Sequence, residues 1–375
     1  MTAFYIIGCG FVADLYMRSF ALYSDAKISA AFDQDPDRRV AFAKHWDVST
    51  VDSLETLFEC AQNDENAIFL NLTNPDAHFE LNKLILEAGF HCYCEKPLAM
   101  DMTDAQSLYA LADDRKRLLA SAPCSYLGEA AQTLAKAVRD NIVGIPRLVY
   151  AELDDGFIPQ ARYHDWISES GAPWPYKDEF NVGCTLEHAG YYLTWLIAMF
   201  GPVKQVVAAS AALIPDKPGP TDTPDFSTAT LFFTDGMVAR LTCSIVAPHN
   251  HQIRVIGENG VLAVKKAWDN AATVKFHRRF NLRRRLLEHP FGKRVKVSGP
   301  THPQVTRKGA AAMNFALGPI EMRDAIRENR PCRMAADFAL HVNEITLAIQ
   351  NSGAHSGALT MQTSCQRPDL MDWAK

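Results

Sequence analysis

A glycine-rich turn near the start of the sequence has the residue types and spacing to bind a phosphate group. The apolar run 4–7 leads into Gly8-Cys9-Gly10-Phe11-Val12-Ala13, a pattern typical of a buried strand that turns into a helix. Gly8 would let the chain reverse, Gly10 would let the backbone approach a pyrophosphate, and Ala13 would let the helix pack closely on the strand. The free N–H groups that open the helix would bind the anion. The motif therefore predicts a dinucleotide-binding turn.

Two other parts of the sequence offer groups for proton transfer. Lys96 follows a short apolar run and precedes Pro97, which favours an extended backbone at the lysine. His188 and Tyr192 are four residues apart, a spacing that puts both side chains on one face of a helix. An imidazole titrates near neutral pH, whereas a phenol is a poor base unless a nearby amine lowers its pKa. The aromatic residues around His188 are equally typical of an apolar packing face, which would make it an ordinary interior histidine.

The choice of dinucleotide depends on the end of the second apolar run. Residues 28–32 end at Asp33, twenty residues after Ala13, where an acidic side chain would accept hydrogen bonds from the adenosine ribose. Asp33 would repel a 2′-phosphate, so the sequence favours NAD. Arg38 and Arg39 are close to Asp33 in the sequence and could bind a 2′-phosphate, so NADP stays an alternative.

The elements that position these groups alternate between strands and helices up to about residue 121. A third apolar run, 67–72, stops at Thr73-Asn74-Pro75, which would border the cofactor. A fourth run, 91–94, ends in Glu95-Lys96-Pro97, and a fifth follows at 118–122. This rhythm predicts a doubly wound parallel sheet of the Rossmann type, with ligands at the carboxyl ends of its strands. We assign residues 1–121 to this dinucleotide-binding domain.

The pattern changes after residue 121 and predicts an α+β domain over 122–375. Helices are expected near 129–141, 186–200, 320–327 and 338–350. Strands with a period of two are expected at 147–153, 205–214, 227–234, 237–247, 252–257 and 261–265. Asp235-Gly236 and Glu258-Asn259-Gly260 are hairpin signals, so the second sheet should be open and mostly antiparallel.

Composition limits the classes of partner and compartment. A chain of 375 residues is longer than one hydrophobic core usually supports, so two domains are expected. A net charge of −5 favours neither nucleic acid nor an anionic membrane as a partner. The longest apolar stretches are strand-length or interrupted, so no transmembrane segment is expected. The first strand begins at once, without room for a cleavable signal, and the nine cysteines form no disulfide or zinc framework. We therefore expect a cytoplasmic protein.

A basic run and a pair of histidines remain to be interpreted. The basic run between 278 and 294 could hold a phosphorylated or nucleotide-linked sugar, but a solvated helix face or an interdomain patch is favoured in a net acidic protein. His249 and His251 lack a third ligand at a recognisable spacing, so no metal site is predicted.

Several motifs together resemble the Gfo/Idh/MocA family, named for glucose-fructose oxidoreductase, inositol dehydrogenase and rhizopine catabolism. The likeness runs nearly end to end. It rests on the turn at 8–13, Asp33, Thr73-Asn74-Pro75 with His78, Glu95-Lys96-Pro97, Gly318-Pro319-Ile320 and the segment 339–344. The resemblance implies a nicotinamide-dependent oxidoreductase that acts on a sugar, polyol or cyclitol. It also implies a homodimer or homotetramer that assembles through the open sheet of the second domain.

The resemblance extends to the cofactor site. It implies contacts with the dinucleotide from residues of the glycine turn and of the two later strand ends. These residues are Gly8, Gly10, Phe11, Val12, Ala13, Asp33, Thr73, Asn74, Pro75, His78, Glu95 and Lys96.

One segment departs from the family pattern. Relatives usually carry Asp-x-Gly-x-His here, with another Asp three residues later. With Gly190 as the anchor, these positions hold His188, Tyr192 and Trp195 in this chain. A tyrosine at the position of Tyr192 occurs in the glucose-fructose branch.

The expected chemistry assigns a role to each titratable group. Lys96 would stabilise alkoxide character on the reacting oxygen, with Glu95 orienting it or keeping it protonated. Tyr192 would contact the hydroxyl and pass its proton to His188 or to water, and the reverse assignment, His188 as the direct base, stays open. Trp166, in an aromatic loop over 156–181, would form part of the wall against which a sugar ring binds.

Two other functions remain open from the sequence. One is a hydrolytic or eliminating enzyme that uses a tightly held nicotinamide transiently. The other is a dinucleotide sensor without catalytic activity, suggested by the altered segment around Gly190.

Overall fold

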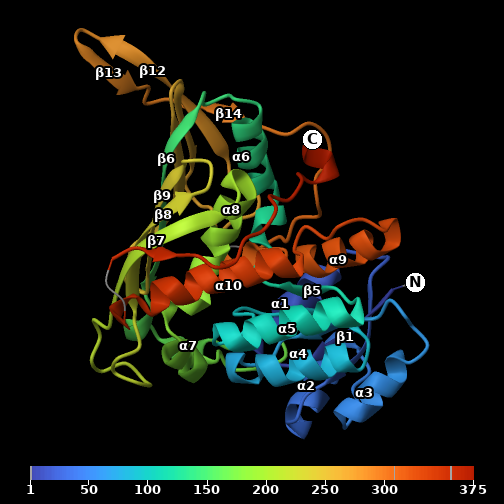
Figure 1. Cartoon of the computed structure of the whole chain (residues 1–375). Coiled ribbons are helices and arrows are strands. Elements are labelled where there is room, and N and C mark those ends of the chain that lie inside the picture. Colours follow the sequence, from blue (N-terminus) through green and yellow to red (C-terminus); the bar gives the residue numbers. More distant parts are fainter. Residues whose placement is uncertain (1, 308, 355–356) are drawn as a thin grey trace.

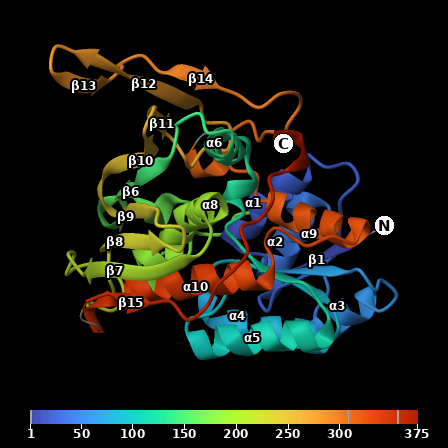
Figure 2. The ribbon, with the colours of Figure 1, turned by 45° about the horizontal axis from the view of Figure 1, so that its top comes forward.

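The first domain is built on a parallel sheet, shown in Figure 1 and, from a second direction, in Figure 2. The computed structural model describes residues 2–307, 309–354 and 357–375. Within them the sheet has five strands in the order β2-β1-β3-β4-β5. The strands are β1 (Ala3–Ile7), β2 (Lys27–Phe32), β3 (Ile68–Asn71), β4 (His91–Cys94) and β5 (Leu119–Ser121). The connecting helices are α1 (Phe11–Phe20), α2 (Pro36–Trp46), α3 (Leu54–Ala61), α4 (His78–Glu87) and α5 (Met102–Arg115).

Alternate side chains of β1 bury against opposite layers of helices. Phe4 and Ile6 belong to a core that includes residues of α1, whereas Tyr5 and Ile7 belong to a second core with residues of α3, α4 and α5. Burial on both faces explains why the strand sequence is continuously apolar. The strand order places β1 beside β3, so their carboxyl ends form the switch point at which such sheets bind ligands.

The second domain is built on a larger sheet. Among the described residues it has ten strands, in the order β13-β12-β11-β10-β6-β9-β8-β7-β15, with β14 pairing with β12. The strands are β6 (Pro146–Phe157), β7 (Val203–Ala211), β8 (Phe226–Phe233), β9 (Val238–Ser244), β10 (Val246–Gly257), β11 (Gly260–Val264), β12 (Val274–Leu282), β13 (Arg285–Glu288), β14 (Lys293–Val295) and β15 (Leu359–Thr360). The β6–β9 pair is parallel and the other pairs are antiparallel. The predicted fold class is therefore confirmed.

Three helices precede or follow the first strand of this sheet. They are α6 (Glu129–Arg139), α7 (Tyr176–Val182) and α8 (Gly190–Phe200), and a π-helical turn over Thr185–Ala189 precedes α8. The predicted aromatic loop over 156–181 thus ends in a helix.

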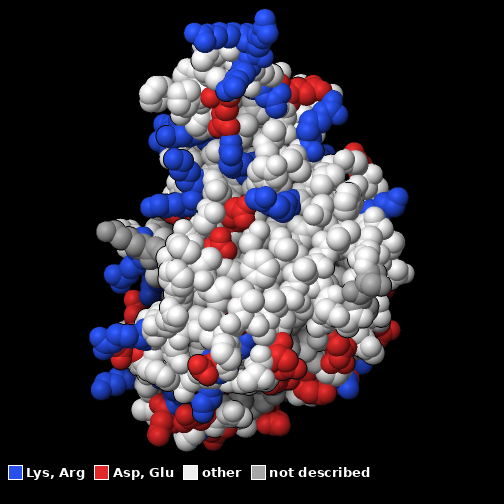
Figure 3. All heavy atoms as spheres, turned by 90° about the vertical axis from the view of Figure 1, so that its left-hand side faces the viewer, with Lys and Arg blue, Asp and Glu red and all other residues white. Residues whose placement is uncertain are grey.

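The basic run is a correction to the sequence analysis. It lies on the strands β12, β13 and β14 rather than on a helix face, and β12 and β13 form a hairpin that projects from the body (Figure 1). Figure 3 shows Lys and Arg gathered at this end of the molecule and Asp and Glu gathered toward the opposite end. These strands carry polar side chains on both faces. They therefore lack the alternation of apolar and polar residues from which strands are predicted.

The last two long helices return to the first domain. α9 (Leu317–Glu328) packs on β3 and β5, and α10 (Ala336–Gln350) packs on α5 of the first domain and on β7 of the second. Figure 1 shows α10 running between the two sheets. The domain boundary at residue 121 stays a prediction, because the C-terminal helices share the core of both parts. None of the helices in the described part of the chain is both long and apolar enough to cross a membrane.

The switch point depends on Gly8. Its φ of +96° is unfavourable for residues with a Cβ atom, and a Cβ there would lie 2.8 Å from the carbonyl oxygen of Leu72. We expect Gly8→Ala to lower the free energy of unfolding by about 1–3 kcal/mol, measured by urea denaturation.

Gly10→Ala is the matched control, because Gly10 has a φ of −80° and a Cβ there would meet no described atom within 4 Å. Its denaturation midpoint should equal that of the unaltered protein. Equal midpoints for both variants would contradict the role of Gly8.

Candidate functional site

A cavity of about 780 Å³ opens between the two domains. The first domain contributes the start of α1 and the turns after β3 and β4, and the second contributes the end of β6, α7 and the π-helical turn. The cavity thus begins at the carboxyl edge of the parallel sheet, where a doubly wound fold binds its ligand.

The start of α1 has the features of an anion site. Gly10 is the residue at the N-cap, so no side chain caps the first N–H groups of the helix. Gly10, Phe11 and Val12 line the cavity, whereas Ala13 is fully buried where α1 packs on the sheet. These residues fit a pyrophosphate, because unpaired N–H groups and the positive end of the helix dipole face a space that no side chain fills.

The acidic residue after β2 has a partner in the glycine turn. Asp33 Oδ2 accepts a hydrogen bond of 2.7 Å from the backbone N–H of Cys9. Arg38 Nη2 donates to the carbonyl oxygen of Cys9 at 2.7 Å and to Ser170 Oγ at 2.8 Å. Arg38 also lines the cavity, and Asp33 and Arg38 both bond to the backbone of Cys9 in the glycine turn.

The turn after β3 borders the cavity through Thr73, Asn74 and Pro75. His78 lies behind this turn and is fully buried. Its Nδ1 faces the carbonyl oxygen of Pro97 at 2.7 Å and its Nε2 faces that of Thr73 at 3.0 Å. His78 therefore holds two strand-end turns together, and among the described residues it is not part of the cavity wall.

Lys96 extends from the end of β4 into the cavity, where Nζ forms an ion pair with Glu187. Burial alone would lower the pKa of Lys96, but Glu187 and Glu179 reverse this effect and raise it. Burial raises the pKa of Glu187, and Lys96 offsets part of that rise. Lys96 is therefore held in its charged form.

Glu95 does not pair with the amine of Lys96 in the structure. Its Oε1 accepts a hydrogen bond of 2.6 Å from the hydroxyl of Tyr16, and its Oε2 accepts one of 3.1 Å from the backbone N–H of Lys96. Glu95 thus orients the backbone of the turn, while the partner of the ammonium group comes from the second domain.

His188 forms the second charged pair of the cavity. Its Nε2 lies 2.7 Å from Oε1 of Glu179, and its buried Nδ1 has no hydrogen-bond partner among the described residues. Burial alone would lower the pKa of His188, but the Glu179 carboxylate outweighs it and raises the pKa to about 9. The imidazole is thus mostly charged at neutral pH.

Tyr192 does not share the cavity with His188, which differs from the expectation. Its hydroxyl is buried, without a hydrogen-bond partner among the described residues, and Tyr191 lines the cavity instead. Successive residues of a helix are rotated by about 100°, so residues 187, 188 and 191 share a face, and residue 192 lies at its border. Glu187 stands directly before His188 in the sequence. As an acidic residue on a largely apolar segment, it was the signal that the face of residues 187, 188 and 191 lines the cavity.

The aromatic loop closes the cavity on the outer side. Trp166 lines the cavity, and the centroid of its ring lies 4.8 Å from that of Trp174. The backbone N–H of Ser170 donates a hydrogen bond of 2.6 Å to Oδ2 of Asp14 in α1. The loop is therefore attached to the helix that opens with the glycine turn.

The sequence analysis missed several residues of the cavity, among them Asp155, Glu179, Glu187 and Trp268. Asp155, Glu179 and Trp268 belong to no motif, and Glu187, although it adjoins His188, is brought to Lys96 only by packing.

The pairing of His188 predicts its titration. Glu179→Gln removes the carboxylate but keeps the shape, so the pKa of His188 should fall from about 9 toward its ordinary 6.5 or below. The NMR resonance of the imidazole, assigned with His188→Gln, measures both values. An unchanged pKa in Glu179→Gln would contradict the pair.

Comparison with known sequences identifies both domains. The family model described as "Oxidoreductase family, NAD-binding Rossmann fold" (GFO_IDH_MocA) matches residues 2–122, and the "GFO/IDH/MocA C-terminal domain" matches residues 131–263. A UDP-N-acetylglucosamine 3-dehydrogenase of Acidithiobacillus ferrooxidans is 26% identical over 241 residues. This match covers 64% of the present chain and 66%, just under two thirds, of the relative.

Solved structures share the fold over nearly the whole chain. The WlbA dehydrogenase of Bordetella pertussis, in complex with NADH and UDP-GlcNAcA, has a TM-score of 0.71 at 19% identity and covers 96% of this chain and 98% of that one. An aldose-aldose oxidoreductase of Caulobacter crescentus, in complex with glycerol, has a TM-score of 0.72 at 18% identity and covers 96% and 99%.

The expected membership of the Gfo/Idh/MocA family, with an NAD-binding Rossmann domain, is thus confirmed. The two domain matches, the shared fold and the open helix start at the switch point agree. The chain belongs to the Gfo/Idh/MocA family of oxidoreductases, and its first domain is the NAD-binding Rossmann domain of that family.

Proposed function

We propose that the protein transfers a hydride between NAD and a secondary hydroxyl carbon of a sugar, polyol or cyclitol. The observation that carries this proposal is the charged Lys96, which shares one cavity with the open N-terminus of α1 and with His188. The sugar-nucleotide dehydrogenase among the relatives supports the substrate class. When bound, NAD accepts the hydride from the hydroxyl carbon and returns it in the reverse reaction.

Lys96 would hold the reacting oxygen. A permanent positive charge there stabilises the negative charge that develops on oxygen as the hydride leaves. Glu187 keeps this charge in place and limits the freedom of the side chain. Lys96 would therefore lower the barrier without itself losing a proton.

His188 would exchange the hydroxyl proton. In oxidation the C–H hydrogen leaves as hydride, the O–H proton passes to the neutral imidazole, and a carbonyl group remains. Because the pKa of His188 is about 9, its neutral fraction grows as the pH rises toward that value. The charged form would donate the proton in reduction, which should be favoured below pH 9. Tyr191, rather than Tyr192, would offer the phenol that faces the substrate.

The substrate would bind between this helix and the aromatic loop. Trp166 and Trp174 line the cavity, and indole rings can pack against the C–H groups of sugars. For the cofactor, Asp33 supports a preference for NAD, since its carboxylate would repel a 2′-phosphate.

We also propose that subunits assemble through the outer face of the second sheet, as a homodimer or homotetramer. Val207 on β7 and Phe232 on β8 are large apolar residues exposed on these strands. Figure 3 shows a largely uncharged surface between the basic and acidic ends of the molecule. Such a surface is suited to burial against a second copy.

A substrate screen with a lysine variant tests the reaction. Sugars, polyols and cyclitols are incubated with NAD, and NADH formation is followed by absorbance. With an active substrate, Lys96→Met should lower kcat about 100-fold or more, because the charge on the reacting oxygen is lost. Lys44→Met, which removes an exposed lysine of α2, is the matched control and should keep full activity.

Lys96→Met/Glu187→Gln removes both charges of the buried pair and should be as inactive as the single variant. If the double variant regained activity, Glu187 left unpaired would explain the loss, and the role of Lys96 would be wrong. Release of a cleaved sugar without net NADH would instead identify a hydrolytic or eliminating enzyme.

The helix start can be tested separately from the chemistry. Gly10→Ala places a methyl group where the pyrophosphate would approach, so the Kd for NAD should rise at least tenfold, measured by calorimetry. Its denaturation midpoint should not change. Unchanged affinity for NAD would exclude the helix start as the binding position.

A further inference from the structure

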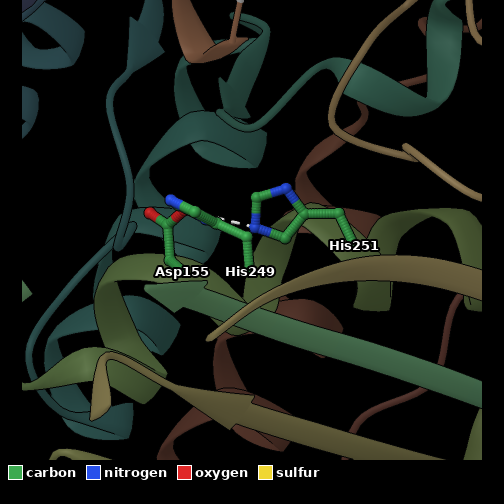
Figure 4. Close-up of side chains that lie close together, drawn as sticks. All are labelled: Asp155, His249 and His251. Atoms are coloured by element: carbon green, nitrogen blue, oxygen red, sulfur yellow. Dashed lines mark ion pairs between the residues drawn. The ribbon is translucent and has the colours of Figure 1, made fainter. Parts of the chain in front are cut away.

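Three side chains with metal-binding atoms meet on the second-domain wall of the cavity. Asp155 lies near the end of β6, and His249 and His251 lie on the neighbouring strand β10 (Figure 4). Asp155 Oδ1 is 3.4 Å from His249 Nδ1 and 3.2 Å from His251 Nε2. The three binding atoms all lie within 4.8 Å of one another.

These separations fit ligands that share one ion. Zinc binds imidazole nitrogen and carboxylate oxygen at about 2.0–2.2 Å in a tetrahedral arrangement, which places neighbouring ligand atoms about 3.3 Å apart. The two measured distances from Asp155 are close to this value. Small adjustments of the His249 side chain, which is largely exposed, would complete the geometry.

The hydrogen bonding of His251 also points to a missing ligand. Its Nε2 is shielded from solvent and has no hydrogen-bond partner among the described residues, although the Asp155 carboxylate is near. The two groups are therefore close without the direction that a hydrogen bond requires. An ion between them would satisfy both, because their lone pairs would then be directed to a common point.

The surroundings hold the ring of His251 in place and leave room for that of His249. Gly156 follows Asp155 with a φ of +81°, and a Cβ atom there would lie 2.9 Å from His249 Nε2. The glycine therefore leaves the space that this ring occupies. Trp268 stacks on His251 with ring centroids 5.2 Å apart and planes at 23°. A site whose ligands are oriented by packing needs little rearrangement to bind an ion.

We propose that Asp155, His249 and His251 bind one divalent transition-metal ion, with zinc preferred for two imidazoles and one carboxylate. Asp155 and His249 line the cavity, so the fourth coordination position would open toward the substrate space. Water or an oxygen atom of the substrate would fill it. Metal binding does not require hydride transfer, so this inference goes beyond the proposed function and can be tested without it.

Calorimetric titration of zinc chloride into the chelator-treated full-length protein tests the site. All proteins carry Cys60→Ser, because Cys60 is exposed and could bind zinc by itself. The unaltered site should bind one zinc ion per chain, and His249→Ala and His251→Ala should each weaken binding at least tenfold. His45→Ala, which removes an exposed histidine of α2, is the matched control and should leave the affinity unchanged.

Failure to bind one zinc ion per chain, or equal affinities in all variants, would overturn the proposal. His249 is exposed, so its variant should fold normally even if His251→Ala does not, and thermal denaturation checks both. Lys96→Met should retain zinc affinity. Loss of dehydrogenase activity with zinc binding intact would count only against the proposed reaction, and the reverse result only against the metal site.

Discussion

A buried ion pair that crosses the cavity constrains how the two domains meet. Lys96 comes from the first domain, and Glu179, Glu187 and His188 come from the second. Removing ions from water costs several kcal/mol for each ion unless an opposite charge is close. The pair of Glu179 and His188 lies within the second domain, whereas Lys96 and Glu187 can pair only when the π-helical turn faces the end of β4. The Lys96–Glu187 pair therefore ties the relative position of the domains to the geometry of the site.

Other contacts across the cavity follow the same arrangement. Arg38 and Asp14 reach Ser170 in the aromatic loop, and α10 packs on both domains at once. These contacts attach the outer wall of the cavity to the helix that would bind the pyrophosphate. The walls that the two domains contribute to the cavity are thus parts of a single packed unit.

The two parts of the cavity use different kinds of groups. The first part uses backbone N–H groups and turns, whose geometry depends on glycines and strand ends. The second part uses side chains, and there His188, at a position where the resemblance to the family implies an aspartate, pairs with Glu179. A carboxylate from α7 and an imidazole therefore share this part of the cavity.

Local sequence determined the strand, turn and helix that open the chain, the parallel sheet, and Lys96 as a group at a strand end, because these depend on side-chain period and on residues a few positions apart. Tertiary structure alone decided that Lys96 pairs with Glu187 rather than Glu95, and that Tyr191 rather than Tyr192 faces the cavity. It also decided that Asp155 lies beside His249 and His251, and that the basic run forms strands. Such choices depend on the rotation of a helix and on pairing between distant strands, and packing sets both only after the local elements have formed.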